Sequence, residues 1–272
     1  FMAGVFTYLY VQAIGLPRLP SLLSAITFMF SGFFVTQILK VETILASVWL
    51  PLALYFVELF FLKRALVFVL AAGLVLSQPL LASHLQFATY AFLATIAYFS
   101  YRLFSQDRSK LSLIKGMSGM GLMILVPFAV AAPQVWAIYE LKPLSDRAQP
   151  ISFINATLHS FHPQHLITFL FPQFFGLQTP ESIGDYWGWP NYWKQVRYVG
   201  IAPVLLTLLA FKTWKAPHKG FFIFLLVISI LLALGRFSPL FWLLRLIPPF
   251  DSFRAPVRFL YLATFALSVL AG

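Results

Sequence analysis

The sequence predicts an all-α fold, a polytopic transmembrane helix bundle of about nine crossings with a long outer loop that contains interfacial or re-entrant helices. Hydrophobic residues make up 60% of the 272 positions, and the mean hydropathy is +0.85. Charged residues make up only 10%, whereas a soluble domain carries about 25%. Apolar runs near the roughly 20 residues of a membrane span recur along the whole chain.

The predicted crossings follow these apolar runs in order. Lys63 and Arg64 divide one long run in two, because two charges at mid-bilayer are costly. The glycine-rich stretch GMSGMG at 116–121 opens the sixth crossing and indicates close helix packing. The predicted crossings are 1–14, 21–39, 43–62, 65–82, 87–103, 116–138, 198–214, 220–235 and 257–272.

We expect a single transmembrane domain over 1–272. Both ends of the sequence lie inside apolar runs, at Phe1 and Gly272, so we expect a piece of a longer protein. The absence of cysteine excludes a disulfide framework, an iron–sulfur site and a thiol nucleophile.

The distribution of basic residues predicts the orientation. Despite the formal net charge of +11, these residues fall mostly in short loops, so they indicate topology and a lipid bilayer partner, with no nucleic acid partner. One side collects ten basic residues against the single loop acid Asp107, and we expect that side to be cytoplasmic. The ten are Arg18, Lys63, Arg64, Arg102, Arg108, Lys110, Lys115, Lys212, Lys215 and Lys219.

Two segments are then expected outside the cell, 139–197 and 236–256. The first is too long for an ordinary connection, so we expect it to be functional or to carry structure of its own. Its stretch 165–176 is apolar but too short to span, which favours an interfacial or re-entrant helix, and 241–247 is a second such stretch. Half-helices at membrane depth line a wet cavity or lie inside protein, so we expect function on this side.

The first candidate site lies in DYWGWPNYWKQVR, which begins at Asp185. A carboxylate beside Trp187, Trp189 and Asn191 suits sugar recognition, because acids and amides bind hydroxyls while rings pack on C–H faces. Glu181 is a second local acid. The alternative is a solvated loop acid beside an interfacial aromatic belt.

The second candidate site is DSFRAPVRF, in which Arg254 and Arg258 lie four residues apart at the outer mouth of the last crossing. Two guanidiniums at a helix N-terminus suit a phosphate or pyrophosphate, which they bind by paired hydrogen bonds. The alternative is that they anchor the helix end to lipid headgroups.

Other polar residues inside apolar surroundings carry weaker signals. His159, His162 and His165 are spaced three apart, but Pro163 interrupts a common helix and no carboxylate joins them, so we favour loop histidines over a metal site. Glu58 lies near Lys63 and is interpreted as a paired or snorkelling acid, not a proton relay.

Ordered motifs along the chain resemble the bacterial YfhO family. They are GLPRLPSLLSAITFMFSGFFV, WLPLALYFVE, FPQFFG with YWGWPNYWKQVRYVGIAPVLL, and PPFDSFRAPVRFLYLATFALSVLAG. SHLQF at 83–87 is similar to that family's Gly-His-Pro-Gln element with its Gly and Pro replaced, which makes His84 and Gln86 candidate ligand contacts or a hydrogen-bonded turn.

The resemblance implies a multi-pass protein of the bacterial cytoplasmic membrane that serves the cell envelope. The YfhO family is similar to polytopic glycosyltransferases, which transfer a sugar from a polyprenyl-phosphate carrier to an acceptor at the outer face. In such enzymes an acid in the first large outer loop acts as base or binds a divalent metal, and that loop is expected upstream of Phe1. The alternatives are a transporter or flippase for a lipid-linked or anionic solute, and a non-catalytic envelope-assembly subunit.

Overall fold

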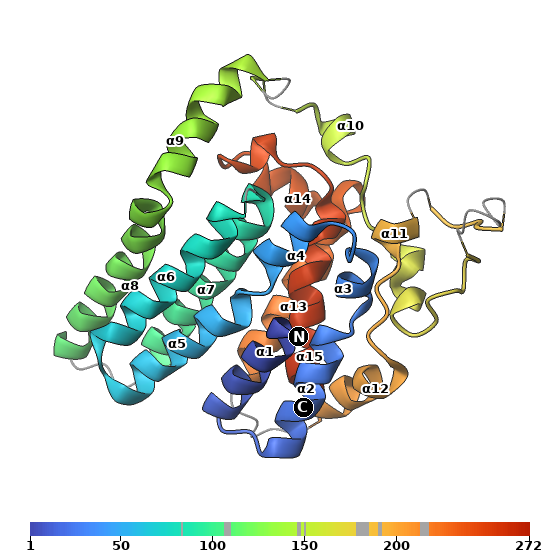
Figure 1. Cartoon of the computed structure of the whole chain (residues 1–272). Helices are drawn as coiled ribbons and strands as arrows, with labels where there is room; N and C mark the ends of the chain where they lie inside the picture. Colours follow the sequence, from blue (N-terminus) through green and yellow to red (C-terminus); the bar gives the residue numbers. More distant parts are fainter. Residues whose placement is uncertain are drawn as a thin grey trace. The chain divides into compact units, whose positions relative to one another are not determined.

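The computed structural model describes residues 1–82, 84–105, 110–145, 148–149, 151–177, 185–189, 192–212 and 218–272, without the side chains of 110–112 and 192–193. Within these residues the chain forms helices and turns and no β-strand, so the predicted all-α fold is confirmed (Figure 1). The helices group into two compact units. Unit 1 holds Phe1–Ala25 and Lys40–Leu141, and unit 2 holds Ile26–Leu39 and Lys142–Gly272.

Three helices among the described residues are long and apolar enough to cross a membrane, namely Arg18–Thr36, Val41–Lys63 and Leu113–Val130. They overlap the predicted crossings 21–39, 43–62 and 116–138. The number is below the nine expected, and four further apolar helices of 10–17 residues lie among the described residues. These are Leu66–Leu81, Ile201–Ala210, Lys219–Ala233 and Pro256–Ala271.

The other six predicted crossings stay a prediction, and so does the single domain over 1–272, since compact units of this kind also occur within one transmembrane domain. A break in an apolar run is the usual reason for a shorter helix. Gly200, at φ +101, precedes Ile201, and Gly235, at φ +54, follows the helix that ends at Ala233.

Unit 1 is built from helices packed side by side. In the order of the chain they are α1 (Met2–Ala13), the start of α2 (Arg18–Met29), α4 (Val41–Ser47), α5 (Leu50–Lys63), α6 (Leu66–Leu81), α7 (Leu85–Ser105), α8 (Lys110–Val130) and α9 (Ala132–Leu141). α6 packs against α5, α7 and α8, and α1 packs against α5. Figure 1 shows α9 continuing from the end of α8.

α5 ends at the charged residues that predicted its end, and α8 packs closely on α7 at a glycine of the stretch that predicted close packing. Arg64 adopts a left-handed conformation, and its N–H bonds the carbonyl of Phe60, so the helix ends at Lys63 as expected. A Cβ at Gly116 would lie 2.3 Å from Cδ1 of Leu103 on α7, and the helices can approach this closely because glycine has none.

Unit 2 is organised around the last helix, α15 (Leu260–Ala271), which is buried along nearly its whole length. α12 (Ile201–Ala210) and α13 (Lys219–Ala233) pack against it. Phe28, at the end of α2, lies with its ring 5.0 Å from that of Phe265. α3 (Gly32–Thr36) begins where the Gly32 N–H donates to the carbonyl of Tyr198 at 2.6 Å.

The rest of unit 2 consists of short helical pieces joined by turns. Between α9 and α12 these are η1 (Lys142–Leu144), α10 (Phe153–Ala156), η2 (Pro163–Phe169) and α11 (Tyr192–Gln195). Between α13 and α15 they are η3 (Gly235–Phe237), α14 (Pro239–Leu244), η4 (Phe250–Ser252) and η5 (Pro256–Phe259). The two half-helices expected at 165–176 and 241–247 are thus a 3-10 helix followed by turns, and a short α-helix that begins earlier, at Pro239.

Hydrogen bonds join the segment between α9 and α12 to the last residue of α13 and to the segment between α13 and α15. The N–H of Phe161 donates to the carbonyl of Ala233 at 2.8 Å, and that of Ala255 to the carbonyl of Ala156 at 3.0 Å. The N–H of Val257 donates to the carbonyl of His159 at 3.2 Å. The two predicted outer segments therefore share one hydrogen-bonded region of unit 2.

Candidate functional site

The loop Asp185–Trp189 folds back on the turn that follows η2. The N–H of Trp187 donates to the carbonyl of Phe175 at 3.0 Å, and the hydroxyl of Tyr186 donates to the carbonyl of Trp189 at 2.6 Å. The Trp187 ring lies 4.7 Å from the Phe175 ring in an edge contact. The loop is therefore tied to its neighbours by its backbone as well as by its rings.

A glycine makes the close approach of this loop possible. Gly176 has φ +83, and a Cβ there would lie 2.0 Å from the carbonyl oxygen of Asp185. The side chain of Asp185 is exposed, and Trp187 is 66% exposed. Asp185 and Trp187, two of the four residues expected to shape a sugar site, thus reach solvent from a loop whose backbone is held in place, whereas Trp189 is half-buried.

His165 contacts the loop Asp185–Trp189 through a hydrogen bond and packs on Phe175 through its ring. This residue lies in η2, is 1% exposed, and stacks on Phe175 with ring centroids 4.2 Å apart. Its Nε2 accepts the backbone N–H of Trp189 at 3.0 Å. Burial, and to a lesser extent the nearby charge of His162, lowers the pKa of His165 from 6.5 to about 4, so the imidazole is neutral at ordinary pH.

His162 completes the aromatic contacts of Trp189. The two rings stack at 4.9 Å with an interplanar angle of 24°, and Phe237 of η3 meets the edge of His162 at 4.9 Å. His162 also caps η2, because its Nδ1 accepts the N–H of Gln164. Among the described residues no group of three His, Cys, Asp or Glu side chains could hold a metal ion.

Gln195 links α11 to this region and is fully buried. Its Nε2 donates to the carbonyl of Ser160 at 2.9 Å, and its Oε1 accepts the N–H of His162 at 3.4 Å. Its own carbonyl accepts the hydroxyl of Thr168 at 3.2 Å. Gln195 therefore connects α11 to both ends of η2.

Arg254 and Arg258 lie just before the last helix. Arg254 is exposed, whereas Arg258, within η5, is half-buried. Ala255 between them has φ +60, and its N–H bonds Ala156, so the backbone between the two arginines turns sharply. The first helical turn of α15 follows directly at Leu260.

The two candidate sites belong to the same unit. α11, which follows the loop Asp185–Trp189 along the chain, packs against η5, which carries Arg258. A further cation, Arg197, lies at the end of this segment and is 3% exposed, and burial lowers its pKa to about 10. Its guanidinium donates to the carbonyl of Val196 at 2.8 Å.

His84 and Gln86 lie in unit 1, not in unit 2. The His84 ring meets Phe87 at 4.6 Å, and Gln86 donates to the hydroxyl of Tyr90 at 2.6 Å. Gln86 is buried at the start of α7. Its hydrogen bond to a side chain one helical turn away fits the alternative of a hydrogen-bonded turn.

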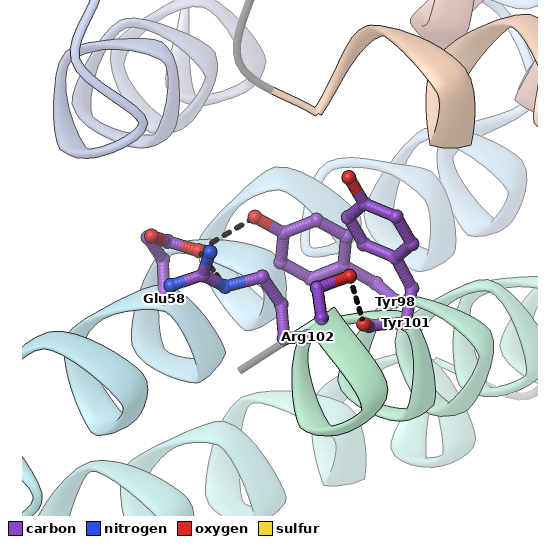
Figure 2. Close-up of polar contacts among 5 residues, drawn as sticks. Glu58, Tyr98, Tyr101 and Arg102 are labelled. Atoms are coloured by element: carbon purple, nitrogen blue, oxygen red, sulfur yellow. Dashed lines mark hydrogen bonds and ion pairs between the residues drawn. The ribbon is translucent and has the colours of Figure 1, made fainter. Parts of the chain in front are cut away.

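Unit 1 also holds a buried charged pair that joins two helices (Figure 2). Arg102 on α7 lies with Nε 3.0 Å from Oε2 of Glu58 on α5, and Tyr98 donates its hydroxyl to the same oxygen at 2.6 Å. The prediction that Glu58 is a paired acid is confirmed. Its partner is Arg102, while the Lys63 ammonium lies over the ring of Phe68 at 5.3 Å.

Asn191 and Glu181, which the sequence also singled out, lie outside the described residues. Two buried residues that hold the loop region together were missed, namely Ser160 and Gln195. His165 was named from the spacing of the histidines as a loop histidine, but its burial and its hydrogen bond to Trp189 were not predicted. Comparisons of the chain with models of protein families, with characterised proteins and with solved structures gave no match.

Proposed function

We propose that this protein is part of a membrane glycosyltransferase that uses a sugar carried on a polyprenyl phosphate, at the outer face of a bacterial cytoplasmic membrane. In this proposal Arg254 and Arg258 bind the carrier phosphate. Asp185, Trp187, Trp189 and Asn191 shape the site for the sugar or its acceptor. All nine predicted crossings, and the placement of 139–197 and 236–256 outside, belong to the same proposal.

One observation carries the proposal. The segment with an exposed carboxylate and an exposed indole, Asp185–Trp189, leads into α11, and α11 packs against the helical turn that holds Arg258. A sugar phosphate needs both chemistries within one site: acceptors and rings for the sugar, and guanidiniums for the phosphate. Candidate membrane spans in the same chain supply the apolar environment that a polyprenyl carrier requires.

The arginine role is tested by Arg254→Lys. A lysine keeps the charge but cannot reproduce the paired hydrogen bonds of a guanidinium, so transfer from a polyprenyl-phosphate sugar should fall at least about tenfold. Arg236→Lys is the matched control, because Arg236 is also an exposed arginine of unit 2. Full activity of the Arg254→Lys protein in lipid nanodiscs would remove the phosphate-binding role.

The sugar-binding role is tested by Asp185→Asn. A hydrogen bond to a charged group contributes about 1.5–3 kcal/mol, so affinity for the donor should fall roughly ten- to a hundredfold. Asp251→Asn is the control, because Asp251 is an acid of the same unit whose Oδ1 already accepts the hydroxyl of Ser252 at 3.1 Å. Measurement of free polyprenyl phosphate distinguishes an enzyme from a transporter. A transferase releases this product, whereas a transporter would move the lipid-linked solute without releasing a free carrier phosphate.

A further inference from the structure

The hydrogen bond between Trp189 and His165 fixes the protonation state of the imidazole. The backbone N–H of Trp189 donates to Nε2 at 3.0 Å, and a nitrogen that accepts a hydrogen bond carries no proton. A neutral imidazole must then carry its proton on Nδ1. In the part of the chain that the structure describes, this buried Nδ1 has no hydrogen-bond partner.

Protonation of this imidazole would remove the acceptor. An imidazolium carries a proton on both nitrogens, so an Nε2–H would face the N–H of Trp189, two donors in contact with no acceptor between them. The added charge would also lie in a site that is 1% exposed and covered by the ring of Phe175. Both effects oppose the closed position of the loop.

The groups around His165 offer little to stabilise such a charge. Among the described residues, His162 and Tyr186 are titratable side chains whose rings lie near it, each with a ring centroid 6.4 Å away. Asp185 is the acid of the neighbouring loop, and its side chain is exposed. Lys194 is the charged residue of α11, the helix whose Gln195 carbonyl accepts the hydroxyl of Thr168 in η2.

We infer that His165 is the positioning residue of the loop Asp185–Trp189, which it holds only while its imidazole is neutral with the proton on Nδ1, and that protonation of His165 releases the loop. The loop thereby has two states, one tied to η2 and one free of it. Acid at the face of the membrane where the loop lies selects the free state. This inference goes beyond the proposed function and needs no sugar or carrier for its test.

The tautomer is tested by nitrogen NMR of protein labelled with ¹⁵N-histidine in lipid nanodiscs. The chain has five histidines, and the resonances lost in His165→Gln belong to His165. Near pH 7 they should belong to an imidazole protonated on Nδ1, and they should titrate near the lowered pKa of about 4. A proton on Nε2, or titration at the ordinary value, would overturn the inference.

Loop release is tested by hydrogen exchange of the peptide that covers 185–195, corrected for the intrinsic effect of pH. In the wild type, protection should be on the order of fifty- to a hundredfold lower at pH 4.5 than at pH 7.5. In His165→Gln the amide oxygen still accepts the Trp189 N–H but does not titrate, so protection should be the same at both pH values. An equal loss in wild type and His165→Gln would overturn the inference.

Two further variants sharpen this result. His162→Gln should keep the pH dependence of the wild type, because His162 does not accept the Trp189 N–H. A loss of the pH dependence in this variant would assign the transition to His162 and contradict the inference. His165→Phe keeps a ring against Phe175 but has no acceptor, so its loop should be unprotected at both pH values, and a protected loop would contradict the role of the hydrogen bond.

Discussion

Arg102 on α7 reaches Glu58 on α5 with its Nε 3.0 Å from the carboxylate, and both side chains are largely buried, at 12% and 2% exposed. The carboxylate also accepts the hydroxyl of Tyr98 at 2.6 Å. If either charge of such a buried pair is removed, the other stays buried without a counter-ion, and its desolvation cost is no longer offset. Three side chains thus join two helices of unit 1 through one carboxylate oxygen (Figure 2).

Removing one member of this pair should destabilise unit 1 strongly. Glu58→Gln leaves the Arg102 guanidinium buried without its counter-ion, and we expect a loss of about 3–5 kcal/mol. The double variant Glu58→Leu with Arg102→Met should recover most of it, because apolar residues of similar size can replace a buried pair. Thermal unfolding in detergent measures both. Lys63→Met, which removes an exposed charge from the same helix, serves as the control, and equal stability of Glu58→Gln and this control would contradict the prediction.

The position of the loop Asp185–Trp189 should depend on Gly176. Gly176→Ala places a Cβ 2.0 Å from the Asp185 carbonyl and forces alanine into φ +83, a conformation that costs an L-residue about 1–2 kcal/mol. Gly15→Ala is the matched control, since it has a similar φ of +96 but nothing within 4 Å of the new Cβ. We expect only Gly176→Ala to raise hydrogen exchange at Trp187 and Trp189. A similar pattern in both variants would mean that backbone strain alone, and not the contact with Asp185, is at work.

The orientation can be read by cysteine labelling, because the native chain contains no cysteine. Lys63→Cys lies on an exposed turn at the predicted cytoplasmic side, and Leu144→Cys is 85% exposed on the predicted outer side. In intact cells a membrane-impermeant thiol reagent should modify position 144 and spare position 63. Lysed cells, in which both should react, provide the control. The reverse pattern in intact cells would invert the topology.

The free energy that holds the loop to η2 should depend on pH through His165. The pKa of His165 is about 4 when the loop is closed and 6.5 in an open, solvated state. Between these two pH values the open state therefore binds more protons than the closed state. The free energy that favours the closed loop decreases by about 3 kcal/mol in total as pH falls from 6.5 to 4. Below about pH 4 the dependence should level off. Hydrogen exchange of α15 supplies the internal reference, and a loss of equal size in α15 would point to global unfolding.

Several features of the fold could be predicted because they depend on neighbours in sequence. Apolar runs of helical length predicted the helices, and Lys63 with Arg64 predicted the end of α5. The low count of charges made it clear that Glu58 needs a partner. The helices and the end of α5 are local sequence patterns, and the need for a partner follows from the free-energy cost of an unpaired charge in apolar surroundings.

The partners across the fold could not be predicted in the same way. Arg102 is far from Glu58 in sequence, and only the packing of α5 on α7 brings them together. The same holds for Gln195, whose side chain meets Ser160 and His162 from a different segment. The predicted crossing 198–214 was longer than α12, because Gly200, at φ +101, sets the start of that helix at Ile201.

The hydrogen bonds of Ala156 and His159 with Ala255 and Val257 have a consequence for biosynthesis. These pairs lie far apart in sequence, so the segment around α10 and η2 leaves the ribosome long before its partners exist. Contacts of this kind form late, because the chain between them must be made and arranged first. A truncated nascent chain that ends before Ala255 should therefore lack an ordered segment around α10 and η2, even when its earlier helices have formed. Of the whole chain, this segment would depend most on synthesis of the last helix.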